Sequence, residues 1–80
     1  MNELLQQKDT DYAESFNKSI AKTYTTTSKL NLRKGPSKNK AVITIIPKGD
    51  KVTCYGYYTN NWYYVQYKGL VGFCDKNYLK

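Results

Sequence analysis

Histidine is missing from the 80 residues of this chain. This absence removes the side chain that most often acts as a general base, and with it most nucleophile–base pairs. The two cysteines, Cys54 and Cys74, are too few for a disulfide framework and, without histidine, too few for a zinc site. The five glycines lack the spacing of a phosphate-binding loop. The sequence therefore predicts a chain with no catalytic residues, no metal site and no cofactor.

Long apolar runs are missing as well. None approaches the roughly 20 residues that a membrane helix needs. The first seven residues, MNELLQQ, turn polar after two leucines and do not form a secretory signal peptide. Eighty residues make one small domain at most, with an appendage. We expect either a fragment of a longer protein or a chain made in the cytosol and released by another route.

Acidic residues are scarce, and they are unevenly spread. The chain has 13 lysine and arginine residues against six acids, a net charge of +7. Residues 1–28 hold three lysines and four acids, a net charge of −1, whereas residues 29–80 hold the other ten cations and two acids, a net charge of +8. This change predicts an appendage at 1–28 and a basic domain at 29–80. The domain suits an anionic partner such as cell wall, nucleic acid or a membrane surface, unless the lysines only solvate its surface.

The N-terminal segment, about residues 2–22, shows a helical pattern. Leu5, Tyr12, Phe16 and Ile20 recur at intervals that align one face of a helix. A helix this short is marginal alone, so its apolar face needs a partner. The partner is the domain, a second copy of the chain or a separate catalytic domain. The polar, β-branched residues 23–29 then suit a linker into a first edge strand.

The remainder reads as short strands separated by turns, among them Pro47–Asp50, Asn60-Asn61 and Lys68-Gly69. Alternation puts Val52 and Cys54 on an inward face and, farther on, Tyr63, Val65 and Tyr67 on another. Five short strands with tight turns favour a small five-stranded barrel. The clearest strands are Val42–Ile46, Lys51–Tyr58, Trp62–Tyr67 and Leu70–Cys74, followed by one helical turn at Asp75–Tyr78.

The two cysteines both fall on inward faces of this pattern. We interpret Cys54 and Cys74 as buried free thiols that act as small apolar side chains. A disulfide between them stays open as the alternative, because the sequence does not fix their separation. A catalytic thiol is excluded by the lack of histidine to activate it.

Residues 30–79 resemble the bacterial SH3 (SH3b) family, the cell-wall-targeting domains of endolysins and autolysins. Five motifs in order carry the resemblance: LNLRKGPS at 30–37, PKG at 47–49, KVTCYG at 51–56, NNWYYVQYKG at 60–69 and VGFCDKNYL at 71–79. The resemblance implies an SH3-like barrel. It also implies a non-catalytic module that binds the stem or cross-bridge peptide of peptidoglycan and holds a hydrolase against the wall.

The same resemblance implies which residues form a ligand groove. Trp62 corresponds to the groove tryptophan, Asn77 and Tyr78 to the asparagine–tyrosine pair after the last strand, and Asn31 and Arg33 to the start of the long loop. Two departures are visible. The loop lacks the acidic residues with which eukaryotic SH3 domains grip basic proline-rich peptides, and Asp75-Lys76 replaces the proline usual before the asparagine–tyrosine pair.

The residues themselves add candidates and leave alternatives open. Trp62 is either an exposed binding platform or a cover for one end of the barrel. Arg33 suits a bidentate bond to a carboxylate, or a tie between the loop and backbone carbonyls. Asp75 suits an ammonium group of the ligand, or the cap of the turn that follows it. The predicted ligand-binding residues are Asn31, Arg33, Tyr57, Tyr58, Trp62, Tyr64, Asp75, Asn77 and Tyr78.

The leading hypothesis is a peptidoglycan-binding module of a hydrolase from a Gram-positive bacterium or its phage, placed in the cell wall or released at lysis. Its partners would be the wall, a catalytic hydrolase domain or subunit and, through the N-terminal helix, a second copy of the chain. Two other classes remain. One is recognition of proline-rich peptides, and the other is binding of single-stranded nucleic acid by a basic barrel with exposed aromatic rings.

Overall fold

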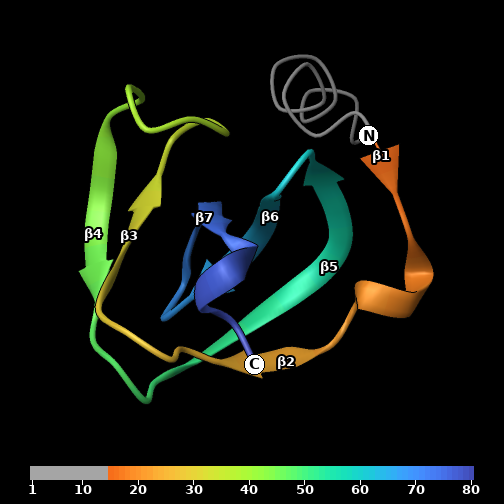
Figure 1. Cartoon of the computed structure of the whole chain (residues 1–80), viewed down its shortest axis with the longest axis horizontal. Helices are drawn as coiled ribbons and strands as arrows, with labels where there is room; N and C mark the ends of the chain where they lie inside the picture. The colour runs from red at the N-terminus through yellow and green to blue at the C-terminus, as the bar shows by residue number, and fades with distance from the viewer. Residues whose placement is uncertain (1–14) are drawn as a thin grey trace.

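A computed structural model describes residues 15–80 as one curled antiparallel sheet with two short 3-10 helices (Figure 1). The strand order is β1-β5-β6-β7-β3-β4, and β2 also pairs with β5. No helical segment in residues 15–80 is long and apolar enough to cross a membrane. The elements are β1 (Ser15–Phe16), η2 (Lys18–Ile20), β2 (Thr23–Thr25), β3 (Leu30–Arg33), β4 (Val42–Ile46), β5 (Lys51–Thr59), β6 (Trp62–Tyr67), β7 (Leu70–Asp75) and η3 (Lys76–Tyr78).

The helix expected over residues 2–22 is wrong where the structure describes it, and its first part lies outside the described residues. Residues 15–22 instead lie along the edge of β5, with Phe16 opposite Tyr57. Backbone groups of β5 account for the difference. Asn17 donates its N–H to the Gly56 carbonyl at 2.9 Å, and the Lys22 carbonyl accepts the N–H of Cys54 at 2.9 Å. Edge pairing therefore satisfies groups that a helix would leave exposed on β5.

The five expected strands are present as β3 to β7, but residues 15–80 contain two more, β1 and β2, so the count of five was too low. The residues in the turns explain why these five strands could be predicted from the sequence. Lys68 and Gly69 both have positive φ, +47° and +83°, as a tight two-residue hairpin between β6 and β7 requires. Asn60, at φ +54°, similarly joins β5 to β6. The left-handed backbone that these hairpins need is therefore encoded by short local sequences.

Gly56 bends the long strand β5. Its φ is +102°, and the register between β5 and β6 shifts between Cys54 and Tyr58. A bulge of this kind increases the local bend and twist of a strand. The first half of β5 pairs with β2 and the second half with β1, so one bent strand carries both N-terminal strands along a single edge. The bend gives the sheet the curl seen in Figure 1.

The core lies inside this curl and confirms the predicted inward faces of β5 and β6. Val52 and Cys54 are at most 2% exposed, and Val65 is fully buried. Tyr67 is also buried, whereas Tyr63 is partly buried against the core. The remaining core residues come mainly from β3, β4 and β7, and are Leu30, Leu32, Ile46, Phe73 and Cys74.

The C-terminal residues close the sheet against the segment that follows β2. Thr25 and Lys80 exchange two backbone hydrogen bonds, of 3.1 and 2.9 Å, and Thr26 bridges to Leu79. Thr26 is 2% exposed, and its hydroxyl donates to the Pro47 carbonyl at 2.7 Å while accepting the N–H of Asp50 at 3.0 Å. A single buried hydroxyl therefore joins the closing segment to the turn between β4 and β5.

Both cysteines are free and buried. Cys54 pairs with Val65, and Cys74 pairs with Tyr63, so strand β6 separates the two thiols. Two strand spacings amount to roughly 9–10 Å, beyond the roughly 7 Å that a disulfide allows between Cα atoms. The alternative of a bridge left open by the sequence is therefore not adopted in this fold.

Burial of the thiols predicts a loss of stability in alkaline solution. Burial raises the pKa of Cys74 to about 12, and also raises that of Cys54. The unfolded thiol ionises near about 8.5, so above that pH the unfolded chain loses a proton that the folded chain keeps, and stability falls. For Cys74 alone we expect a loss of about 2 kcal/mol between pH 8 and pH 10. Denaturant unfolding at pH 8 and at pH 10 measures this loss in the free energy of unfolding. The control is Cys74→Ala, which has no thiol at this position and should lose less stability between the two pH values. Equal losses in the two proteins would contradict the prediction.

Candidate functional site

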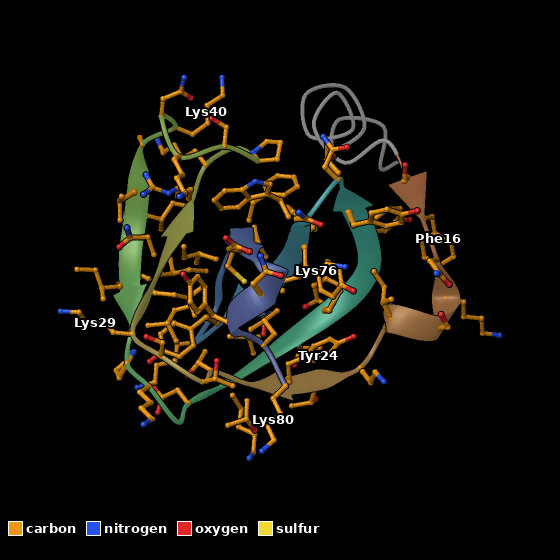
Figure 2. The ribbon with its side chains drawn as sticks, in the orientation of Figure 1. Phe16, Tyr24, Lys29, Lys40, Lys76 and Lys80 are labelled. Atoms are coloured by element: carbon orange, nitrogen blue, oxygen red, sulfur yellow. The ribbon has the colours of Figure 1, made fainter. Side chains whose placement is uncertain are left out.

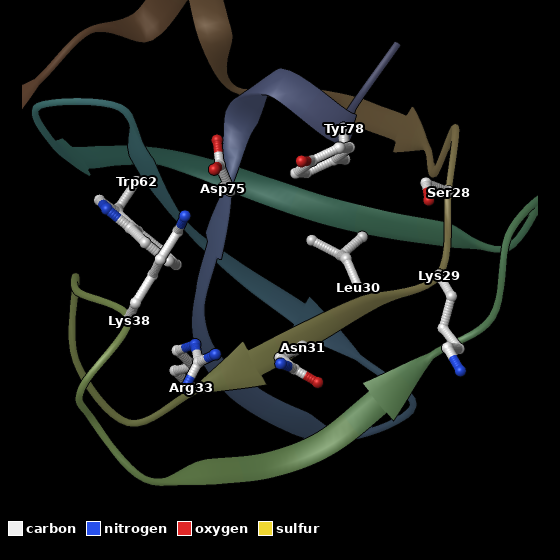
Figure 3. Close-up of a pocket in the computed structure, with 9 residues that line it drawn as sticks. All are labelled: Ser28, Lys29, Leu30, Asn31, Arg33, Lys38, Trp62, Asp75 and Tyr78. Atoms are coloured by element: carbon white, nitrogen blue, oxygen red, sulfur yellow. The ribbon is translucent and has the colours of Figure 1, made fainter.

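A shallow groove of about 210 Å³ lies between β3 with its following loop, the start of β6, and η3 (Figure 3). Trp62 and Tyr78 line it on either side of Asp75, and the Leu30 side chain lies next to the Tyr78 ring (Figure 3). Leu30 is only 7% exposed, so it forms an apolar floor that belongs to the core. The groove is lined by Ser28, Lys29, Leu30, Asn31, Arg33, Lys38, Trp62, Asp75 and Tyr78.

Hydrogen bonds around η3 fix the backbone that carries both aromatic side chains. Trp62 opens β6 directly opposite Asp75, the last residue of β7. The Asp75 carboxylate then caps η3 by accepting the N–H of Asn77 at 3.0 Å. The Tyr78 carbonyl accepts the N–H of Thr27 at 2.8 Å. Trp62 and Tyr78 are therefore held through their backbones, and both side chains line the groove, where a ligand can contact them.

Arg33 has one structural bond and still lines the groove. Its Nη1 donates to the Lys40 carbonyl at 3.0 Å across the loop between β3 and β4. Lys34 and Ala41 pair through their backbones across the same loop, at 2.9 Å. The tie to a backbone carbonyl, one of the two roles considered for Arg33, is thus present. A guanidinium has five N–H donors, so this bond leaves donors for a ligand.

The charge of the groove is mainly positive. Lys29, Arg33 and Lys38 line it with a single carboxylate, Asp75, which already caps η3. In Figure 3 the Lys38 side chain lies beside Trp62, and Lys29 lies at the Tyr78 end. This arrangement suits a ligand that carries an anionic group and an apolar or planar portion. It does not suit the basic proline-rich peptides considered among the alternatives.

The structure brings five of the nine predicted site residues into the groove and leaves four outside it. The five are Asn31, Arg33, Trp62, Asp75 and Tyr78. Tyr57 packs against Phe16, with ring centroids 5.0 Å apart, and Phe16 lies across the molecule from Lys29 (Figure 2). Tyr64 packs against Phe73 at 5.1 Å. Tyr58 lines a separate pocket, and Asn77 is exposed within η3 without lining the groove.

Four lining residues were missed by the sequence reasoning: Ser28, Lys29, Leu30 and Lys38. Ser28 and Lys29 precede the motif at 30–37, and Lys38 follows it directly, so the motif's flanks were the available signal. The reach of a lysine from such a flank depends on the path of the loop, which the sequence does not give.

Nothing in the groove resembles a metal site. Residues 15–80 contain no group of three or more histidine, cysteine or acidic residues placed to hold a metal ion. The groove offers cations, one carboxylate, two amphipathic aromatic rings and an asparagine amide. Such a set binds and orients a ligand.

Comparison with known proteins places most of the described chain in one family and supports its fold. The family described as bacterial SH3 domain matches residues 28–80, which include every residue that lines the groove. The chain is also similar to the solved structure of NlpC2 from Trichomonas vaginalis, with a TM-score of 0.71 and 21% identity, over 76% of this chain and 23% of that one. At that identity the likeness concerns the fold alone. No match was found among curated proteins.

Proposed function

Because the chain belongs to the bacterial SH3 domain family, we propose that it is a non-catalytic module that binds the bacterial cell wall. The observation that carries the proposal is the convergence of Trp62, Tyr78 and Arg33 on one groove. These residues come from three separate motifs of the sequence, and the fold brings them together around an apolar floor. A groove with aromatic ends and cationic sides is suited to binding an extended polymer.

The proposed ligand is the peptide portion of peptidoglycan. Stem peptides carry free carboxylates, which the cations along the groove would attract, while the aromatic rings contact the aliphatic and backbone portions of the peptide. Asp75 faces the same groove and is a candidate to meet an ammonium group of a diamino acid, beside its role as a cap.

The wider setting is part of the same proposal. The module would hold a peptidoglycan hydrolase, an endolysin or autolysin, against a Gram-positive wall, either outside the cell or after release at lysis. The chain spans 23% of the length of the structure it resembles, so such a module accounts for only a part of a larger protein of that kind. Pairing of two copies through the N-terminal segment stays a prediction.

Sedimentation with purified peptidoglycan tests the proposal. We expect the chain to pellet with insoluble walls at low salt and to be released progressively as ionic strength rises, because a positively charged groove contributes to binding. A soluble stem peptide with a free C-terminal carboxylate should compete, and its amidated form should compete less well. Protein that stays in the supernatant at low salt would overturn the proposal.

Single-stranded nucleic acid is the second candidate, since the groove also combines three cations with two aromatic side chains, the exposed Tyr78 and the half-buried Trp62. Titration with oligothymidylate distinguishes the two ligands. For nucleic acid, the logarithm of the binding constant would fall linearly with the logarithm of the salt concentration. Nucleic acid would also compete with wall fragments for Trp62. Tight binding of oligothymidylate without sedimentation on walls would favour this second candidate.

A further inference from the structure

A second pocket, of about 180 Å³, is formed by the stretch between β1 and β2, the β5–β6 hairpin and the start of η3. It is separate from the groove, because the two share no lining residue. Its wall combines two asparagine amides, two tyrosines, one lysine and one aliphatic side chain. These residues are Asn17, Ile20, Tyr58, Asn60, Tyr63 and Lys76.

The segment before the family domain builds one wall of this pocket. The family match begins at residue 28, whereas Asn17 and Ile20 belong to the stretch between β1 and β2. Asn17 is fixed in place twice. Its N–H donates to the Gly56 carbonyl at 2.9 Å, and its Oδ1 accepts from the N–H of Ser19 at 2.9 Å and from the Ser19 hydroxyl at 2.7 Å. With Oδ1 engaged, the two N–H donors on Nδ2 are what this lining side chain has left for a ligand.

Aromatic packing stiffens the opposite wall. Tyr63 packs against Tyr24 with ring centroids 5.7 Å apart, and the Tyr24 hydroxyl donates to the Ile20 carbonyl at 2.9 Å. Tyr24 thereby links the tyrosine on one wall to the chain that forms the other. Tyr63 and Tyr58 are both half-buried, so part of each side chain is accessible at the pocket that it lines.

The chemistry of the lining selects a class of ligand. Neutral amides and hydroxyls predominate, and among residues 15–80 no carboxylate lines the pocket and Lys76 is the one lining cation. Amide groups that donate and accept suit neighbouring hydroxyls, and tyrosine rings cover the apolar face of a ring. The volume is below the roughly 300 Å³ of pockets that enclose a whole small molecule, so it suits one unit of a polymer.

We propose that this second pocket binds one sugar ring of a glycan chain, and that the segment at residues 15–20 is therefore part of the binding surface. The inference rests on the proposed wall-binding function and extends it from the peptide to the glycan of the same polymer. Asn60 and Trp62 are separated by one residue, and the N–H of Lys76 donates to the Asn61 carbonyl at 2.8 Å. The two sites thus share one rigid junction, and a polymer that carries both sugars and peptides would engage both with a gain in avidity.

Chemical-shift mapping of the full chain with tetra-N-acetylchitotetraose tests the inference. We expect the amide signals of Asn17, Asn60 and Lys76 to move, while those of Asn31 and Arg33 and the fluorescence of Trp62 stay unchanged. A soluble stem peptide should give the opposite pattern. Sugar-induced changes centred on Trp62, or none at millimolar sugar, would overturn the assignment of this pocket.

Two variants remove the amides and keep the fold. Asn60→Gly retains the positive φ of the turn, at +54°, and Asn17→Ser keeps a side chain able to cap η2. Each should weaken tetrasaccharide binding by roughly tenfold, the usual cost of a lost pair of hydrogen bonds. Lys48→Ala, in the exposed turn before β5, is the control and should bind normally. Unchanged affinity in both variants would contradict the proposal.

Failure of this inference and failure of the wall-binding function give different results. If the sugar site is wrong, the chain still sediments with walls, and stem peptide still shifts signals near Trp62. If the wall-binding function is wrong, the chain does not sediment at all, whatever the tetrasaccharide does in solution.

Discussion

Replacing Gly72 by alanine is expected to lower the free energy of unfolding by about 3 kcal/mol, which in a domain of this size lowers Tm by at least about 12 °C. A Cβ at this position would lie 2.6 Å from the Arg33 carbonyl oxygen and 2.9 Å from Cδ1 of Ile43. The first of these contacts is with backbone, which cannot rotate away. The substitution therefore forces β7 away from β3 at the crossing that holds the groove-lining strand in place.

Gly49→Ala is the matched control for Gly72→Ala. Gly49 has φ +88° with no atom within 4 Å of an added Cβ, so its substitution costs only the backbone strain, roughly 1 kcal/mol. Thermal unfolding of both variants separates steric crowding from conformational strain. A smaller loss for Gly72→Ala than for Gly49→Ala would show that β3 and β7 adjust to the methyl group without cost.

Replacing Trp62 by alanine is expected to reduce affinity for wall fragments at least about 30-fold, the effect of losing a central aromatic contact of about 2 kcal/mol. Trp62 is half-buried at one end of the groove, and its place in β6 is held by pairing with Asp75 and Thr59. The side chain can therefore be removed while the strand keeps its hydrogen bonds. Trp62→Phe, which retains a smaller ring, should lose part of the affinity.

Tyr55→Ala is the matched control for Trp62→Ala. Tyr55 is an aromatic residue 41% exposed on β5 that lines neither pocket. Sedimentation with walls and calorimetric titration with stem peptide should show normal binding for this variant. Circular dichroism confirms that both variants are folded. Equal losses of affinity for the two variants would show that the groove is not the binding surface.

The strands β3 to β7 could be predicted because their turns are encoded locally. Lys68-Gly69 and Asn60-Asn61 mark hairpins, and alternation identifies the buried faces between them. The N-terminal segment could not be predicted in the same way. Phe16 and Ile20 are four residues apart, as on one face of a helix, yet pairing with the edge of β5 decides their structure. The backbone groups that attract this segment lie about 40 residues away in the sequence, beyond the reach of a local pattern.

Groove residues that belong to a sequence motif could be predicted. Those whose position depends on the path of a loop could not. Trp62 and Tyr78 lie at strand and turn boundaries, which the motifs fix. Tyr57 does not line the groove, because β5 carries β1 on its edge and the Tyr57 ring packs against Phe16. Lys38 was missed because its position depends on the loop between β3 and β4, which is held by the bond between Arg33 and Lys40.

The pairing of residues 25–27 with residues 78–80 has a consequence for the order in which the protein is made. The last residues of the chain hydrogen-bond to a segment translated long before them, and such distant contacts form late in folding. A nascent chain on the ribosome that lacks them has neither Tyr78 nor a closed sheet. The sheet closes, and Tyr78 reaches its place beside the groove, only once residues 78–80 have paired with residues 25–27.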